Sequence, residues 1–119
     1  PIELDDLLET VDSDERLLTI LQFSIWRLEA LETWHRDAIF QALKDLSTGM
    51  DLKLKVFLAP LFIAIAGSRS SISVMDSMQM LGPDMARARL RHALALLGGV
   101  GKKKLKTLEK TYLGLPPSS

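Results

Sequence analysis

The sequence predicts an all-α protein, and three observations support this prediction. Apolar residues recur at steps of three and four positions along most of the chain, which is the period of an amphipathic helix. Helix-favouring residues such as Leu, Ala, Lys and Glu dominate, whereas the alternation typical of strands is scarce. Capping residues precede several of the apolar stretches. We therefore expect a helical cage or bundle of about five to six helices, followed by a lysine-rich helical tail.

The first elements are a short turn and a long helix. A helical turn is expected over residues 4–9, and Ser13 is placed to cap a helix that continues to Glu32. Asp14 and Glu15 favour this start, because carboxylates interact well with the positive end of a helix dipole. The inward stripe of this helix is expected to contain Leu17, Leu18, Leu21, Ile25, Leu28 and Leu31.

Two further helices are expected in the middle of the chain. Thr33 is placed to cap a helix over residues 34–46, which Gly49 ends. The apolar run from Val56 to Ala66 fits either a buried strand or a central helix. The lack of a partner strand favours a helix with Pro60 in its first turn, where the missing N–H does no harm. This helix and Trp34 are expected to form the core.

The remaining helices are separated by glycines and prolines. Ser71 or Ser73 can cap a short helix that ends at Gly82, and Pro83 opens the next helix, which runs to Leu97. The inward residues of that helix are expected to be Met85, Ala86, Leu90, Ala93, Leu94 and Leu97. We divide the chain into a helical domain over residues 1–97 and a flexible glycine hinge with a basic helical tail over residues 98–119, whose helix is expected at 102–113.

Composition disfavours several kinds of chemistry. The chain has no cysteine, which excludes disulfides, thiolate zinc sites and cysteine nucleophiles. His35 and His92 stand alone in separate helices, and the acidic clusters lie at helix starts, so we expect no metal site and no catalytic residue. The longest apolar run falls short of the roughly 20 residues that a spanning helix needs, so we expect no membrane partner. The cytoplasm is the default location that we expect for this chain. Since residue 1 is proline, we expect the chain to be a fragment.

The net charge of zero hides an asymmetry between the two halves. Residues 1–50 contain eleven acids and four bases, whereas residues 51–119 contain four acids and eleven bases. Basic residues either solubilise a helix face or contact the phosphates of a polyanion such as RNA, and both interpretations remain open here. The candidates for phosphate contact are Arg87, Arg91, Lys102, Lys103, Lys104 and Lys106.

A set of short motifs spread over residues 14–96 is similar to one known family. The motifs are Trp34, the runs 54–61 and 64–67, Met80-Leu81-Gly82, Arg89-Leu90 and Ala93-Leu94. In order and spacing they resemble the C-terminal anticodon-binding region of bacterial glutamyl-tRNA synthetases.

The resemblance implies an α-helical cage that binds the anticodon loop of a tRNA, most simply glutamate tRNA, in protein biosynthesis. It also implies an N-terminal catalytic domain as a partner, with ATP and Mg²⁺ as cofactors of that domain. The nucleotide-binding motifs of such a domain are absent from these 119 residues. We therefore expect neither a cofactor nor enzymatic activity in this fragment.

The resemblance also places the residues that read the anticodon. In the family, an arginine after a Pro-Leu pair reads a base together with two residues beyond the following glycine, and these places fall on Phe62, Ser71 and Val74. Since Phe62 replaces the arginine, the resemblance implies stacking on an unpaired base and looser discrimination, with Val74 as an apolar wall. Arg69 is expected to be the only guanidinium close enough to replace the lost donor.

Two functions therefore remain open from the sequence. One is a tRNA-binding module of a glutamyl-tRNA synthetase that contributes tRNA recognition to aminoacylation. The other is a helical protein-interaction or dimerisation domain that kept this fold and lost anticodon reading. Phe62 supports the second, because exchanging a guanidinium for a phenyl ring removes a charge and several hydrogen-bond donors.

Overall fold

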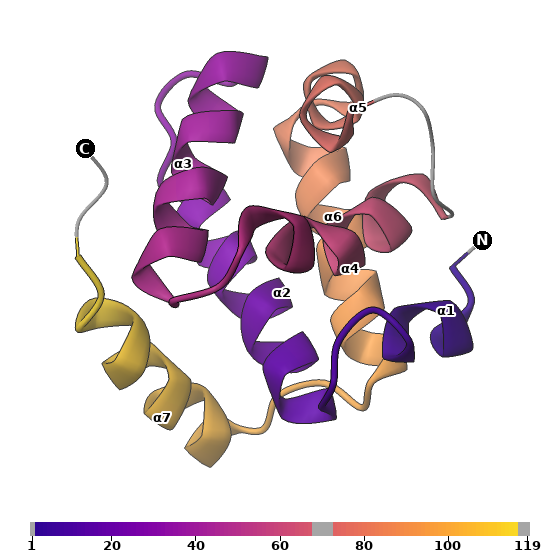
Figure 1. Cartoon of the computed structure of the whole chain (residues 1–119), viewed down its shortest axis with the longest axis vertical. Helices are drawn as coiled ribbons and strands as arrows, with labels where there is room; N and C mark the ends of the chain where they lie inside the picture. Colours follow the sequence, from indigo (N-terminus) through magenta and orange to yellow (C-terminus); the bar gives the residue numbers. More distant parts are fainter. Residues whose placement is uncertain (1, 68–72, 117–119) are drawn as a thin grey trace.

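The computed structural model describes residues 2–67 and 73–116, and these ranges contain seven α-helices and no strand (Figure 1). The all-α prediction is confirmed, with slightly more helices than expected. Arg69 and Ser71 lie outside the described residues. The helices are α1 (Leu4–Leu8), α2 (Asp14–Glu29), α3 (Arg36–Gly49), α4 (Leu54–Ala66), α5 (Val74–Leu81), α6 (Pro83–Leu96) and α7 (Lys102–Leu113).

Helix α4 lies at the centre of the fold. It packs against α1, α2, α3, α5 and α6, and α2 and α6 pack against each other (Figure 1). Its sequence is apolar on nearly every side, which is typical of a helix surrounded by others. Phe57, Leu61 and Ile65 are fully buried, and Ile63 is only 5% exposed. Trp34 is half-buried against the same core. The structure therefore confirms the expected central helix.

The helix caps agree with the sequence at two places and differ at a third. The Ser13 hydroxyl accepts the Arg16 N–H at 3.1 Å, and the Ser73 hydroxyl accepts the Asp76 N–H at 3.1 Å. The expected cap at Thr33 is wrong. His35 caps α3 instead, with Nδ1 accepting the Asp37 N–H at 3.2 Å. The preceding helix α2 ends at Glu29 rather than at residue 32, which leaves a longer connection between the two helices.

The expected position of Pro60 in the first turn is also wrong. Helix α4 begins at Leu54, so Pro60 lies in its second turn. There its ring has no N–H to donate to the carbonyl of Val56. Val56 is 38% exposed, so this carbonyl belongs to a residue at the surface of the domain rather than in its core.

Helix α6 buries a narrower stripe than expected. Ala86, Leu90, Ala93 and Leu94 are buried, and their spacing places them on one face of the helix. Met85 was assigned to the core by its apolar character, but it is 50% exposed. It precedes Ala86 by one residue, which turns it about 100° away from the buried face.

The glycines after α6 form a defined turn. Gly98 adopts a left-handed φ of +99°. Its N–H donates to the carbonyl of Ala95 at 3.0 Å, and the N–H of Gly99 donates to that of Leu94 at 2.9 Å. These two bonds form a Schellman motif, which satisfies the last carbonyls of α6. In the segment expected to be a flexible hinge, Gly98 and Gly99 thus form a hydrogen-bonded helix end. The chain after it returns α7 to the side of α2 (Figure 1).

Candidate nucleic-acid interface

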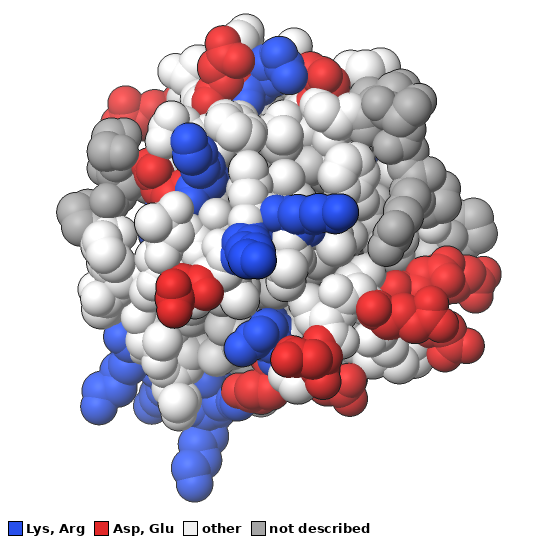
Figure 2. Space-filling model, viewed as in Figure 1, with Lys and Arg blue, Asp and Glu red and all other residues white. Residues whose placement is uncertain are grey.

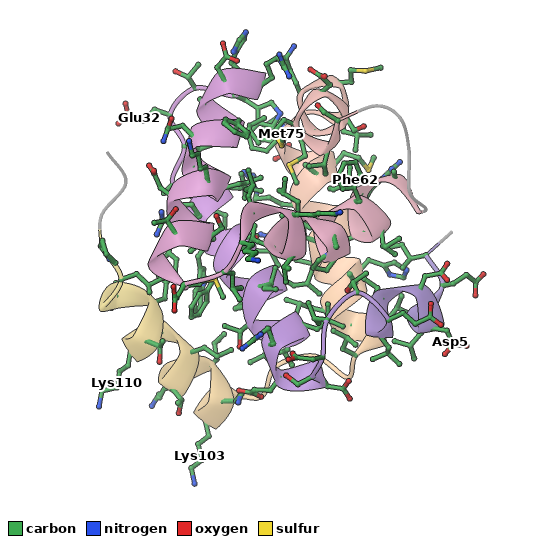
Figure 3. The ribbon with its side chains drawn as sticks, in the orientation of Figure 1. Asp5, Glu32, Phe62, Met75, Lys103 and Lys110 are labelled. Carbon is green, nitrogen blue, oxygen red and sulfur yellow. The ribbon has the colours of Figure 1, made fainter. Side chains whose placement is uncertain are left out.

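The C-terminal half of α4 carries the first predicted contact residue. Phe62 is half-buried and lies on the α5 side of α4 (Figure 3). Val74, the first residue of α5, is only 1% exposed and belongs to the core, so its side chain does not reach the surface. The other two predicted residues, Arg69 and Ser71, precede α5 in the part of the chain outside the described residues.

Arg89 lines two hollows at the end of α4. The larger has a volume of about 410 Å³ and the smaller about 190 Å³. Arg89 itself donates a hydrogen bond from Nη1 to the carbonyl of Ile65. The larger hollow is lined by Ile2, Ala64, Ile65, Ala66, Gly67, Arg89 and His92, and the smaller by Ile65, Ala66, Ser77, Met80, Leu81 and Arg89.

Arg69, the guanidinium expected near Phe62, lies outside the described residues. Arg89 from α6 donates to the carbonyl of Ile65, one turn further along α4 than Phe62. Its positive charge also suits the negative end of the α4 dipole. No local sequence signal predicts this contact, because it depends on how α6 packs against α4.

The first residue of α3 and the segment before it contact α5. The indole Nε1 of Trp34 donates to the carbonyl of Met78 at 2.9 Å. The Arg36 N–H donates to Oε1 of Gln79 at 2.7 Å, and Arg36 Nε lies 2.6 Å from Oδ1 of Asp76. Asp76 is also the residue that pairs with the Ser73 cap. Helix α5 is thus held along its length by contacts from a distant part of the chain.

The basic residues predicted to contact phosphates differ in their environments. Arg87 pairs with Asp84 at 3.0 Å, Arg91 with Glu29 at 3.3 Å, and Lys104 with Glu15. Such surface ion pairs contribute only about 0 to 1 kcal/mol each, so an RNA phosphate can replace the carboxylate at small cost. The remaining three, Lys102, Lys103 and Lys106, are exposed and form no ion pair within the described residues.

The charge asymmetry of the sequence is also an asymmetry in space. Figure 2 shows acidic side chains gathered over α1 and basic ones projecting over α7, at different edges of the molecule. Across residues 2–67 and 73–116, His, Asp and Glu side chains nowhere form a group of three or more that could hold a metal ion. In the same ranges, no helix is both long enough and apolar enough to span a membrane.

Comparison with known proteins gives the family of this fold. The family model described as an anticodon binding domain matches residues 1–94. The chain belongs to the anticodon-binding domain family. The resemblance seen in the sequence is therefore confirmed, and the matched part of this anticodon-binding domain runs from its first residues into the last turn of α6. Helix α7 lies wholly beyond the matched residues.

Curated relatives show the same relationship at higher identity. The chain is 56% identical over 101 residues to the glutamate–tRNA ligase of Cellvibrio japonicus, covering 85% of this chain and 20% of the relative. The glutamate–tRNA ligase of Psychrobacter sp. strain PRwf-1 is 56% identical over 102 residues, which cover 86% of this chain and 20% of that relative. The glutamate–tRNA ligase of Marinomonas sp. strain MWYL1 is 47% identical over 115 residues, which cover 97% of this chain and 23% of that relative. This alignment is long enough to include α7. This anticodon-binding domain spans about a fifth of the length of these relatives.

Proposed function

We propose that this chain is the tRNA-binding module of a glutamate–tRNA ligase and that it binds the anticodon loop of glutamate tRNA. The match of the anticodon-binding family to residues 1–94 carries this proposal. The relatives are named glutamate–tRNA ligases, and these names support glutamate as the amino acid of the proposed ligase. In such a cytoplasmic protein, aminoacylation with ATP and Mg²⁺ takes place in a separate catalytic domain, and this module contributes tRNA recognition. The comparisons give no support to the alternative of a protein-interaction domain.

The region around the end of α4 is the proposed place of base recognition. Phe62 is half-buried, which leaves part of its ring for stacking on an unpaired base. Met80, beside the smaller hollow, is 80% exposed and extends the apolar surface. Stacking tolerates different bases, so discrimination requires hydrogen-bond donors. Arg69 and Arg89 are the two guanidinium groups proposed to supply them.

Phosphate contacts are proposed to supply the part of the affinity that does not depend on the anticodon. Arg87 and Arg91 lie one turn apart on α6, and each already holds an exposed or partly exposed carboxylate. Contacts of this type orient the RNA and weaken with salt, because they displace condensed counterions.

The decisive experiment compares binding to glutamate tRNA with binding to versions that differ only in the anticodon. Glutamate tRNA is expected to bind more tightly, and Phe62→Ala is expected to weaken all of these complexes by about 5-fold to 150-fold, the equivalent of one lost stacking contact. Arg69→Ala and Arg89→Ala then show which guanidinium supports discrimination. Met85→Ala, which changes an exposed side chain of α6, is the matched control. Equal affinity of the wild type for every anticodon would contradict the proposed function.

A further inference from the structure

Helix α7 has two faces of different character. Successive residues of a helix turn by about 100°, so Lys102, Lys103, Lys106 and Lys110 fall within an arc of about 100° on one side. Leu105, Leu108 and Tyr112 fall on the other side. Figure 3 shows Lys103 and Lys110 extending away from the body of the molecule. We call the four lysines the lysine ridge.

The opposite face of α7 is docked on α2 by an aromatic cluster. Leu108 is 5% exposed. The Tyr112 ring lies 5.2 Å from Phe23 and 5.2 Å from Trp26, centroid to centroid. Arg27 donates from Nε to the Tyr112 hydroxyl at 3.1 Å, and its guanidinium lies 5.3 Å from the centre of the same ring. All three partners of Tyr112 belong to α2.

Further contacts are made near both ends of α7. Near its start, Lys104 pairs with Glu15 in the first turn of α2. After its end, the chain passes close to α3, where a Cβ built on Gly49 would lie 3.8 Å from that of Leu115. The Schellman motif at Gly98 sets the direction of the chain before α7. The lysine ridge is therefore held at one place on the domain rather than carried on a loose tail.

The charges of the lysine ridge are unfavourable for an isolated helix. Lys102 and Lys106, and likewise Lys106 and Lys110, are four residues apart, where like charges repel. The first turn of α7 contains lysines and no acid, although the positive end of the helix dipole disfavours cations there. Within the described residues, no carboxylate forms an ion pair with any of the four lysines. An anionic partner removes this repulsion.

We infer that the lysine ridge of α7 binds the RNA phosphate backbone beside the anticodon loop. The inference rests on the proposed function and adds to it a preformed surface outside the part of the chain that the family model matches. It includes Lys110, which the sequence reasoning missed, and assigns Lys104 to docking on Glu15 instead. Because α7 is already docked, the lysines bind phosphates without the entropy loss of ordering a tail.

The first test is the salt dependence of binding to glutamate tRNA, measured with the full-length protein. Each phosphate contact contributes about 0.7 to 0.9 to the slope of log affinity against log salt concentration. Replacing all four ridge lysines by Gln is expected to reduce the magnitude of the slope by about 3. Affinity is expected to fall by the same factor for glutamate tRNA and its anticodon-substituted versions. An unchanged slope overturns the inference. If the slope is unchanged and the four-lysine variant loses binding to polyglutamate, the ridge binds an acidic protein rather than RNA.

Lys44→Gln provides a matched control for Lys106→Gln. Lys44 is an exposed lysine on α3, with its ammonium 6.0 Å from the centre of the Phe40 ring. Both substitutions remove one positive charge, but only Lys106→Gln is expected to lower the slope, by about 0.7 to 0.9. Equal effects would show that net charge alone matters and would overturn the inference.

Tyr112 variants test the docking without removing a lysine. Tyr112→Ala is expected to lower affinity for tRNA, whereas Tyr112→Phe keeps the ring in the aromatic cluster and is expected to retain most of the affinity. Unchanged binding by Tyr112→Ala would overturn the role of docking.

Two different measurements distinguish a failure of this inference from a failure of the proposed function. A wild type that does not distinguish anticodons contradicts the proposed function. Intact discrimination together with an unchanged slope in the four-lysine variant contradicts only the role of the ridge.

Discussion

Ile63→Ala tests whether α4 is the central helix of the domain. Ile63 is 5% exposed and belongs to the buried core, so the substitution removes nearly all of its contacts. It deletes three carbon groups, and each buried group contributes about 0.8 kcal/mol, which gives about 2.4 kcal/mol before any cavity is counted. The cavity adds to this because α4 is packed against five other helices and cannot collapse freely. The expected loss of unfolding free energy is therefore about 2 to 5 kcal/mol.

The assay is urea unfolding followed by far-ultraviolet circular dichroism. Ile63→Ala is expected to lower the midpoint without changing the slope of free energy against urea, because the surface exposed on unfolding stays nearly the same. Ile63→Val removes one carbon group and is expected to cost about 0.5 to 1.5 kcal/mol. Met80→Ala is the control: Met80 is 80% exposed, and its truncation is expected to change stability by at most about 0.5 kcal/mol. A loss below about 0.5 kcal/mol for Ile63→Ala would refute the central position of α4.

Three further predictions concern local features, each measured by thermal or urea unfolding. Gly98→Ala is expected to cost about 1 to 2 kcal/mol, because Gly98 has a φ of +99° and nothing within 4 Å of an added Cβ, so backbone strain is the cause. Gly98→Asn should recover part of this loss, and no recovery would point to another cause. Ser73→Ala is expected to cost about 1 kcal/mol by removing the cap on the Asp76 N–H, whereas Ser73→Asp should keep most of the stability. Tyr112→Phe is expected to cost about 0.5 to 1.5 kcal/mol through the hydrogen bond from Arg27; a neutral result would show that the ring alone docks α7.

The predicted base-reading site is only partly assembled by the described residues. Phe62 is half-buried on α4, whereas Val74 is 1% exposed and belongs to the core, so Val74 is not available at the surface as the expected apolar wall. Arg89 brings a guanidinium from α6 to the same end of α4. The Arg69→Ala and Arg89→Ala variants therefore decide whether either guanidinium takes the proposed role of the family arginine that Phe62 replaces.

Ion pairs in the folded chain engage some of the basic residues that are proposed to contact RNA. Of the arginines and lysines predicted from the sequence, Arg87, Arg91 and Lys104 each hold a carboxylate. Two of these carboxylates, Glu29 and Glu15, belong to α2. The acidic first half of the chain thus neutralises part of the basic second half, and the lysine ridge is the part of α7 that remains unpaired within the described residues.

Features that depend on a few neighbouring residues were predictable from the sequence. The caps at Ser13 and Ser73 and the bounds of the helix over residues 102–113 agree with the structure. Caps and helix periodicity act over one or two turns, so the sequence itself contains all the groups involved. The resemblance added the family, because it rests on the order and spacing of short motifs.

Tertiary packing determined which residues from distant parts of the chain contact one another. Thr33 has good capping chemistry, yet His35 caps α3, in a connection where Trp34 and Arg36 are bound to α5. The position of Arg89 beside α4 and the docking of Tyr112 on α2 likewise appear only in the fold. The His35 cap is itself local, but the contacts of Trp34, Arg36, Arg89 and Tyr112 join groups that are far apart in sequence. Which of these groups meet is determined by how the helices pack to bury their apolar faces.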